Sequence, residues 1–135
     1  MAETIFDKII RHEIPAEIIY EDDRVIAFLD IAPINPGHTL FIPKASCENM
    51  MCTSDEDLTH LFSIAKKIAP VILKTVGATD FNFHTNNGPI AGQAVMHTHF
   101  HFIPRFENDG IQTLSRHKST AEERTELQKK IISSL

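Results

Sequence analysis

The sequence predicts an α+β fold with a mainly antiparallel sheet of about five strands. Three observations support this: strand-like runs are joined by tight turns, one long helical pattern lies in the middle, and shorter helical patterns lie near both ends. The chain of 135 residues has the length of about one domain, and neither an internal repeat nor a linker divides it. We therefore expect a single domain over residues 1–135.

The first part of the chain alternates apolar runs with turns. Thr4 to Arg11 predicts a short N-terminal helix, because Thr4 and Asp7 have the spacing of a capping box. The segment 31–37 contains two prolines and a glycine, which favour a loop over a regular ladder. Strands are expected before and after this loop, over residues 18–20, 25–29 and 39–42.

The longest helical pattern spans residues 55–76. Ser54 is its expected cap, acidic residues occupy its first turn, and Gly77 closes it. Pro70 is expected to kink or interrupt the helix. Its apolar stripe consists of Leu58, Leu61, Phe62, Ala65, Ile68 and Ala69.

The second half contains three further patterns. Residues 81–85 alternate as a half-buried strand, and a glycine-rich loop over 86–94 follows them. The run 95–103 is rich in Phe, Val and Ile and is expected as a strand. Residues 119–135 predict a C-terminal amphipathic helix.

Composition excludes several classes of protein. A net charge of −5 leaves no broad basic surface for nucleic acid. The sequence shows neither a signal peptide pattern nor an apolar run of roughly 18 residues, so we expect no membrane span. Cys47 and Cys52 are too few for a disulfide framework and poorly spaced for zinc, so we expect two partly buried free thiols. These features favour a cytoplasmic protein.

Three histidines alternate with other residues near the end of the chain. Because side chains alternate along a strand, His97, His99 and His101 are expected on one face. Three rings that titrate near neutral pH favour a chemical site over a solvated face, which is the plain alternative. A metal site with help from His38 and His84 is a further alternative, although one strand cannot bring three rings to a single ion.

The loop before these histidines contains Gly88 and Gly92. Glycines let backbone N–H groups approach an anion closely, although a lone glycine-rich loop is most often a turn. Combined with a row of imidazoles, the loop favours phosphoryl transfer, in which a histidine attacks phosphorus while N–H groups stabilise the developing charge.

These segments resemble a known family. The run Gly92-Gln93-Ala94-Val95-Met96-His97-Thr98-His99-Phe100-His101-Phe102-Ile103, followed by Pro104-Arg105, is similar to the signature of the histidine triad (HIT) nucleotide hydrolases and transferases. The resemblance extends through residues 36–44 and 4–31, and thus covers about residues 4 to 105. It implies a HIT-like fold with a long central helix, and a homodimer formed through the sheets and that helix.

The resemblance also implies a catalytic role for four histidines. His99 would attack the α-phosphorus and carry a nucleotidyl group, and His101 would hydrogen-bond the phosphate. His97 would face the leaving group and help to protonate it, with His38 behind it. Water would then release the nucleoside monophosphate.

The nucleotide would be held by residues from several segments. The phosphate would be bound by the side chain of Asn86 and by the backbone of Gly92, Gln93 and Ala94. Asp30 would accept hydrogen bonds from the ribose hydroxyls. The purine would be sandwiched by Ile5, Phe6, Ile9, Phe28 and Ile31. Without the resemblance, these apolar side chains would be read as core and Asp30 as a turn cap.

Three departures refine this expectation. Ala94 stands where many members have Ser or Thr, and one lost hydrogen bond could remove about 1–3 kcal/mol of transition-state stabilisation. Thr4 and Asp7 replace a cysteine pair that some members use for zinc, so we expect no structural zinc and no required cofactor. His101 in place of Gln disfavours the uridylyltransferase branch.

The sequence therefore predicts a Hint-type phosphoramidase that releases AMP from purine nucleoside 5′-phosphoramidates. Asn86 and the Ile5–Phe6 segment favour this substrate over the alternative, a dinucleoside polyphosphate. A second alternative is a nucleotide-binding interaction module whose turnover is incidental.

Overall fold

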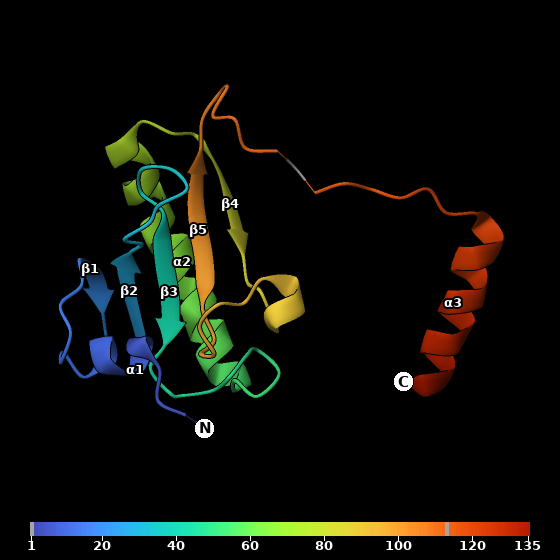
Figure 1. The fold of residues 1–135 in the computed structure, drawn as a ribbon, viewed down its shortest axis with the longest axis horizontal. Helices are drawn as coiled ribbons and strands as arrows, with labels where there is room; N and C mark the ends of the chain where they lie inside the picture. The colour runs from blue at the N-terminus through green and yellow to red at the C-terminus, as the bar shows by residue number, and fades with distance from the viewer. Residues whose placement is uncertain (1, 113) are drawn as a thin grey trace.

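A computed structural model describes residues 2–112 and 114–135. Within them, one antiparallel sheet has the strand order β1-β2-β3-β5-β4 (Figure 1). Its strands are β1 (Ile18–Glu21), β2 (Val25–Leu29), β3 (Thr39–Pro43), β4 (Asp80–His84) and β5 (Phe100–Arg105). The helices are α1 (Ile5–Ile10), α2 (Asp55–Val76), α3 (Ala121–Ser134) and the 3₁₀ turn η1 (Pro89–Ala91). The expected α+β architecture is confirmed.

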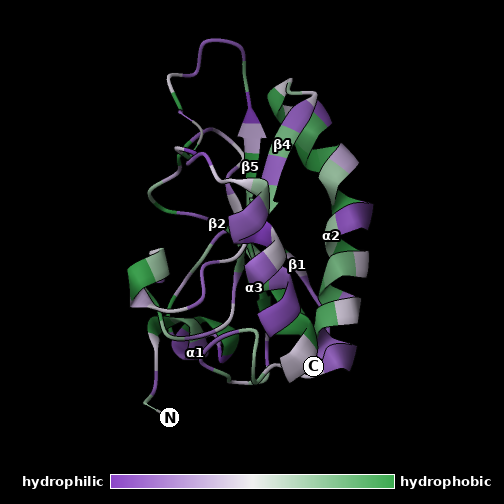
Figure 2. Ribbon diagram, turned by 90° about the vertical axis from the view of Figure 1, so that its right-hand side faces the viewer, coloured by the Kyte–Doolittle hydropathy of each residue, from purple (hydrophilic) through white to green (hydrophobic). Residues whose placement is uncertain are grey.

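The two faces of the sheet are covered by different helices (Figure 2). Val25 and Ala27 of β2 pack toward α2, whereas Ile26 and Phe28 pack toward α1. Because both faces are buried, β2 is a continuous apolar run without polar alternation. His101 lies between Phe100 and Phe102 of the α2 face, so its side chain points to the α1 face.

Helix α2 begins and ends where its caps predict. The Ser54 side chain accepts a hydrogen bond from the Asp57 N–H, and Gly77 closes the helix in the left-handed conformation. Of the two expected effects of Pro70, the interruption is wrong, because the helix continues through the proline, whereas a kink there stays a prediction. Ala69 and Ile72 are buried on either side of this proline, and their packing offsets the lost backbone hydrogen bond.

Strand β5 begins at Phe100, five residues later than expected. The His97 N–H donates to the Val95 carbonyl, and the Thr98 N–H donates to the Cys47 carbonyl. These amides therefore make no ladder with β3. His97 and His99 nevertheless both lie on the α1 side of the sheet, because Phe6 of α1 packs edge-on against each of their rings.

The C-terminal helix forms over Ala121–Ser134, close to the expected 119–135. It stands apart from the sheet (Figure 1). Of the helices within residues 2–112 and 114–135, none has the length and apolar character that a bilayer crossing requires.

Candidate active site

One end of the sheet gathers four polar residues on neighbouring strands. Asp30 directly follows β2, His38 directly precedes β3, and His101 pairs in register with His84 of β4. His38 Nε2 lies 2.9 Å from His101 Nδ1 and 3.6 Å from an Asp30 carboxylate oxygen. Strands that are far apart in sequence thus bring these side chains into one cluster.

The hydrogen bonds of this cluster fix the tautomers of two histidines. The Ile34 N–H donates to His38 Nδ1 at 3.0 Å, so the His38 proton is on Nε2 and is donated to His101 Nδ1. His101 then carries its own proton on Nε2. Burial, and then the neighbouring His99 and His38, lower the pKa of His101 to about 4. At neutral pH His101 is therefore an uncharged ring with one N–H to offer a ligand.

The same cluster has the donors of a metal site. The ligand atoms of Asp30, His38 and His101 lie within 4.8 Å of one another. However, the hydrogen bond between the two rings uses His38 Nε2 and His101 Nδ1, the atoms a metal would need. The arrangement in this structure is thus a hydrogen-bonded chain of neutral rings. That no structural zinc is required stays a prediction.

His99 is arranged as a nucleophile. Its ring is buried, and its Nδ1 donates to the His97 carbonyl at 2.7 Å, which leaves the Nε2 lone pair for chemistry. Burial lowers the pKa of His99 below the ordinary 6.5, so the ring is neutral at pH 7. The His101 and Phe6 rings each lie at a centroid distance of 5.0 Å from the His99 ring, both in edge-on orientations.

His97 stands apart from this pair. Its side chain is fully buried, and its Nε2 donates to the Pro43 carbonyl at 2.7 Å. Its Nδ1 lies 3.5 Å from an Asp7 carboxylate oxygen and is the one buried side-chain nitrogen or oxygen without a hydrogen bond in the described residues. Both ring nitrogens face protein, so the geometry does not support the expected contact of His97 with a leaving group.

Asp7 links this buried histidine to helix α1. Burial opposes its ionisation, but hydrogen bonds from Ser46 and Thr4 outweigh that effect and lower the Asp7 pKa to about 2. Asp7 is also the third residue of α1 and forms the capping box with Thr4. One carboxylate therefore connects the helix, Ser46 and the first histidine of the triad.

The glycine-rich loop is held by the side chain of Gln93. This buried side chain accepts a hydrogen bond from the Gly88 N–H and donates to the Glu48 and Val95 carbonyls. Gly92 has a φ of +92°, which side chains rarely permit. Asn86 lies beside Gly92, since an added Cβ there would meet the Asn86 amide at 3.7 Å.

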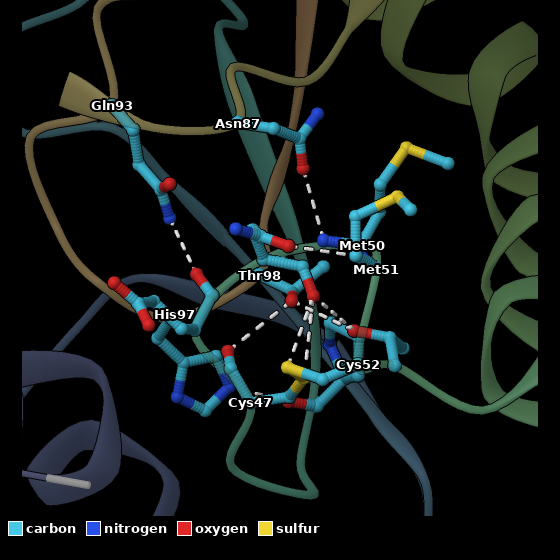
Figure 3. Close-up of a disulfide and its surroundings, with 12 residues drawn as sticks. Cys47, Met50, Met51, Cys52, Asn87, Gln93, His97 and Thr98 are labelled. Atoms are coloured by element: carbon cyan, nitrogen blue, oxygen red, sulfur yellow. Dashed lines mark hydrogen bonds between the residues drawn. A yellow bond between two sulfur atoms is a disulfide. The ribbon is translucent and has the colours of Figure 1, made fainter. Parts of the chain in front are cut away.

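A disulfide between Cys47 and Cys52 lies near Asn87 and Gln93 of this loop (Figure 3). The expectation of two free thiols is wrong, because a turn brings the Cα atoms of Cys47 and Cys52 to 5.9 Å. The enclosed segment contacts the site: Met50 N–H donates to Asn87, and Cys47 accepts from Thr98. The cytoplasmic location stays a prediction, and the disulfide weakens its cysteine argument because such bonds are rare in reducing compartments.

The expected purine sandwich divides into two parts. Phe6, Ile9 and Phe28 belong to the buried core on the α1 face. Ile5 is 49% exposed and Ile31 is 90% exposed, so these two side chains are accessible to a base. Three of the five side chains expected to contact the purine are therefore buried core residues.

His84 is the residue that sequence reasoning assigned only to a metal alternative. Its ring stacks on His101 at a centroid distance of 5.1 Å, and burial lowers its pKa. The signal was present in the strand pattern, because a strand over 81–85 that pairs with the histidine strand places His84 opposite His101.

The HIT domain family model matches residues 11–108, which is most of the chain. The chain belongs to the histidine triad (HIT) family. A solved HIT structure from Sulfolobus tokodaii, 35% identical to this chain, is described as a hypothetical histidine triad nucleotide-binding protein.

Individual HIT proteins agree with this assignment. An uncharacterised HIT-like protein of Methanocaldococcus jannaschii is 50% identical over 106 residues, covering 78% of this chain and 81% of the relative. The Arabidopsis thaliana adenylylsulfatase HINT3 is 40% identical, covering 84% of this chain and 59% of the relative. A HIT family crystal structure from Bacillus subtilis has a TM-score of 0.90 and 37% identity, covering 99% of this chain and 98% of that one.

Proposed function

We propose that this HIT protein hydrolyses purine nucleoside 5′-phosphoramidates and releases AMP through a nucleotidyl group on His99. The arrangement of His99 supports the proposal most directly. Its Nδ1 is committed to the His97 carbonyl, and its lowered pKa keeps Nε2 unprotonated at neutral pH. The ring is therefore oriented and in the protonation state for attack.

The reaction has two balanced steps. Nε2 of His99 attacks the α-phosphorus, the P–N bond breaks, and the leaving nitrogen takes a proton from water, because His97 is enclosed. Water then attacks the same phosphorus and gives a proton to the hydroxide left by the first step, the bond to Nε2 breaks, and AMP leaves with His99 regenerated. His101 donates its Nε2 proton in a hydrogen bond to a phosphate oxygen in both steps, and His38 holds the His101 ring.

The remaining site residues bind the nucleotide. The Asn86 side chain and the backbone of Gly92, Gln93 and Ala94 face the phosphate. Asp30 accepts hydrogen bonds from the ribose hydroxyls. Ile5 and Ile31 contact the purine, and Phe6, Ile9 and Phe28 support them from the core.

Phosphorus NMR without added metal tests this function. We expect AMP to appear from adenosine 5′-phosphoramidate with the parent protein, and at least about 10⁴-fold more slowly with His99→Ala. His117→Ala is the matched control, since that histidine is exposed and outside the site. Faster cleavage of diadenosine tetraphosphate would assign the protein to the dinucleotide branch. Binding of both nucleotides without turnover would indicate an interaction module.

We also propose a homodimer of this chain. β4 is an edge strand of the sheet, and apolar side chains of α2 beside it are exposed, with Phe62 at 49% and Phe81 of β4 at 44%. An unpaired edge next to an apolar surface is the usual signature of a protein contact.

A further inference from the structure

The nucleophile is oriented by a carbonyl that the sheet does not hold. His99 Nδ1 donates to the His97 carbonyl at 2.7 Å, and strand β5 begins only after His99. The His97 N–H bonds to the Val95 carbonyl rather than to a neighbouring strand. The orientation of His99 therefore depends on the contacts that fix His97.

The His97 ring lies between two acceptors. Its side chain has no exposed surface, and its Nε2 donates to the Pro43 carbonyl at 2.7 Å. The other ring nitrogen, Nδ1, lies 3.5 Å from an Asp7 carboxylate oxygen and has no hydrogen-bond partner in the described part of the chain. An ionised carboxylate can only accept, so this contact is attractive toward an N–H at Nδ1 and repulsive toward a lone pair.

The Asp7 carboxylate that faces this nitrogen is ionised and buried. Its pKa of about 2 keeps it charged at neutral pH. Thr4 donates to one oxygen with both its N–H and its hydroxyl, and Ser46 donates to the other. Among the described residues, His97 is the one basic side chain at ion-pair distance from Asp7. A buried carboxylate is costly without a cation beside it, so His97 is the group that can compensate its charge.

We propose that Asp7 holds His97 as a buried imidazolium, and that this ion pair fixes the carbonyl to which the nucleophile His99 donates. Asp7 is then a positioning residue, because it acts on His99 through His97. Burial is the main cause of the lowered His99 pKa, and the charge of His97 adds to it, so the pair also favours the neutral nucleophile. The proposal rests on the proposed function in one respect, the role of His99 as the nucleophile.

The ion pair joins three segments that are distant in sequence. Asp7 lies in α1, Ser46 follows β3, and His97 precedes β5. Phe6, the neighbour of Asp7 in α1, packs edge-on against the rings of His97 and His99. Helix α1 therefore acts on the nucleophile through an apolar contact and through a charge.

Long-range ¹H–¹⁵N NMR of the imidazole nitrogens tests the ion pair in the parent protein without substrate. At neutral pH we expect both nitrogens of His97 to be protonated, and His99 to be protonated on Nδ1 alone. In Asp7→Asn, which keeps the shape and removes the charge, we expect His97 to lose a proton and His99 to populate both tautomers. A His97 ring with one unprotonated nitrogen in the parent protein would overturn the proposal.

Kinetics separate positioning from helix stability. We expect Asp7→Asn to lower kcat for the phosphoramidate about tenfold or more and to leave KM nearly unchanged, because the nucleotide contacts remain. Thr4→Ala is the matched control, since it removes the cap of the same helix but keeps the carboxylate, and we expect it to lower stability without lowering kcat. Equal losses of kcat in the two variants, or a raised KM at constant kcat, would contradict a positioning role.

Failure of the hydrolase assignment is recognised separately. A parent protein without turnover would remove the proposed function and the kinetic comparison. The NMR spectra of the parent protein and of Asp7→Asn would still decide whether Asp7 holds His97 as a cation and whether that cation fixes the tautomer of His99.

Discussion

Three histidines of the site are each oriented by a backbone group that the ring contacts. His99 donates to the His97 carbonyl, His97 donates to the Pro43 carbonyl, and His38 accepts from the Ile34 N–H. Fixed carbonyls and amides cannot change their role, so they determine which nitrogen of each ring carries the proton. His99 and His101 consequently present opposite functions to a ligand, a lone pair and an N–H.

The pH dependence of turnover follows from these rings. Because burial lowers the pKa of His99 below 6.5 and that of His101 to about 4, both are neutral at pH 7. We expect kcat/KM to be level near neutrality and to fall only below pH 6.5, as His99 gains a proton and loses its lone pair. Phosphoramidate hydrolysis measured against pH checks this. An acid limb centred at or above pH 6.5 would contradict the burial argument.

Asp7 gives a second prediction at this scale. Its pKa falls from 3.8 to about 2 on folding, so its ionised form stabilises the protein above pH 3.8, and this stability is lost as the pH falls toward 2. We expect Asp7→Asn to lower the free energy of unfolding at pH 7 by about 2 kcal/mol and to flatten its dependence on acid. Urea titrations at pH 7 and at a pH near 2 measure the free energy of unfolding of both proteins.

Asp23→Asn is the control for that experiment, because Asp23 lies on an exposed turn. It is expected to change the free energy of unfolding little. Equal effects of the two substitutions would show that the contact with His97 and Ser46 contributes nothing.

At the scale of elements, the phosphate loop depends on a neighbour from another part of the chain. The disulfide-bonded segment 47–52 donates a hydrogen bond to Asn87 and accepts hydrogen bonds from Gln93 and Thr98. The loop itself has few buried apolar side chains, so these polar contacts position it. A change in the segment is therefore transmitted to the site.

Reduction of the Cys47–Cys52 disulfide tests this coupling. Opening such a short loop is expected to lower the free energy of unfolding by about 2 kcal/mol and to raise KM for the phosphoramidate. Dithiothreitol added to urea titrations and to kinetic assays measures both effects. The Cys47→Ser/Cys52→Ser variant should resemble the reduced parent and ignore the reductant. A parent protein whose KM is the same in both redox states would argue against the coupling.

At the scale of the whole molecule, the sheet separates two hydrophobic cores, of which only the one on the α1 face lies beside the histidines. The α2 face packs the larger apolar cluster, and the α1 face packs a smaller one beside the histidines. Gly37 joins the two, since it precedes His38 and lies where α2 and β5 meet. The site is thus anchored on the main core.

Substitution of Gly37 measures this anchoring. Gly37 has a φ of +87°, and an added Cβ would lie 3.0 Å from Val76 and 3.1 Å from Pro104. Gly77 has a similar φ of +75° but open space around it. We expect Gly77→Ala to cost about 1 kcal/mol of unfolding free energy and Gly37→Ala about 2–4 kcal/mol, with a lower kcat for Gly37→Ala alone. Thermal unfolding and kinetics compare the two variants, and equal costs would contradict this packing.

Local sequence alone determined the helix caps at Thr4, Ser54 and Gly77, the apolar runs of the central strands and the row of histidines. Such features depend on residues a few positions apart, so their physical causes can be read along the chain.

Tertiary structure alone decided the stacking of His84 on His101, the contact of Asp7 with His97, the pairing of Cys47 with Cys52 and the isolation of α3. Each of these depends on how distant segments, or the turns between them, orient side chains in space. Residue types show which groups are available for chemistry, whereas packing determines which ring nitrogen faces a substrate and which faces a carbonyl.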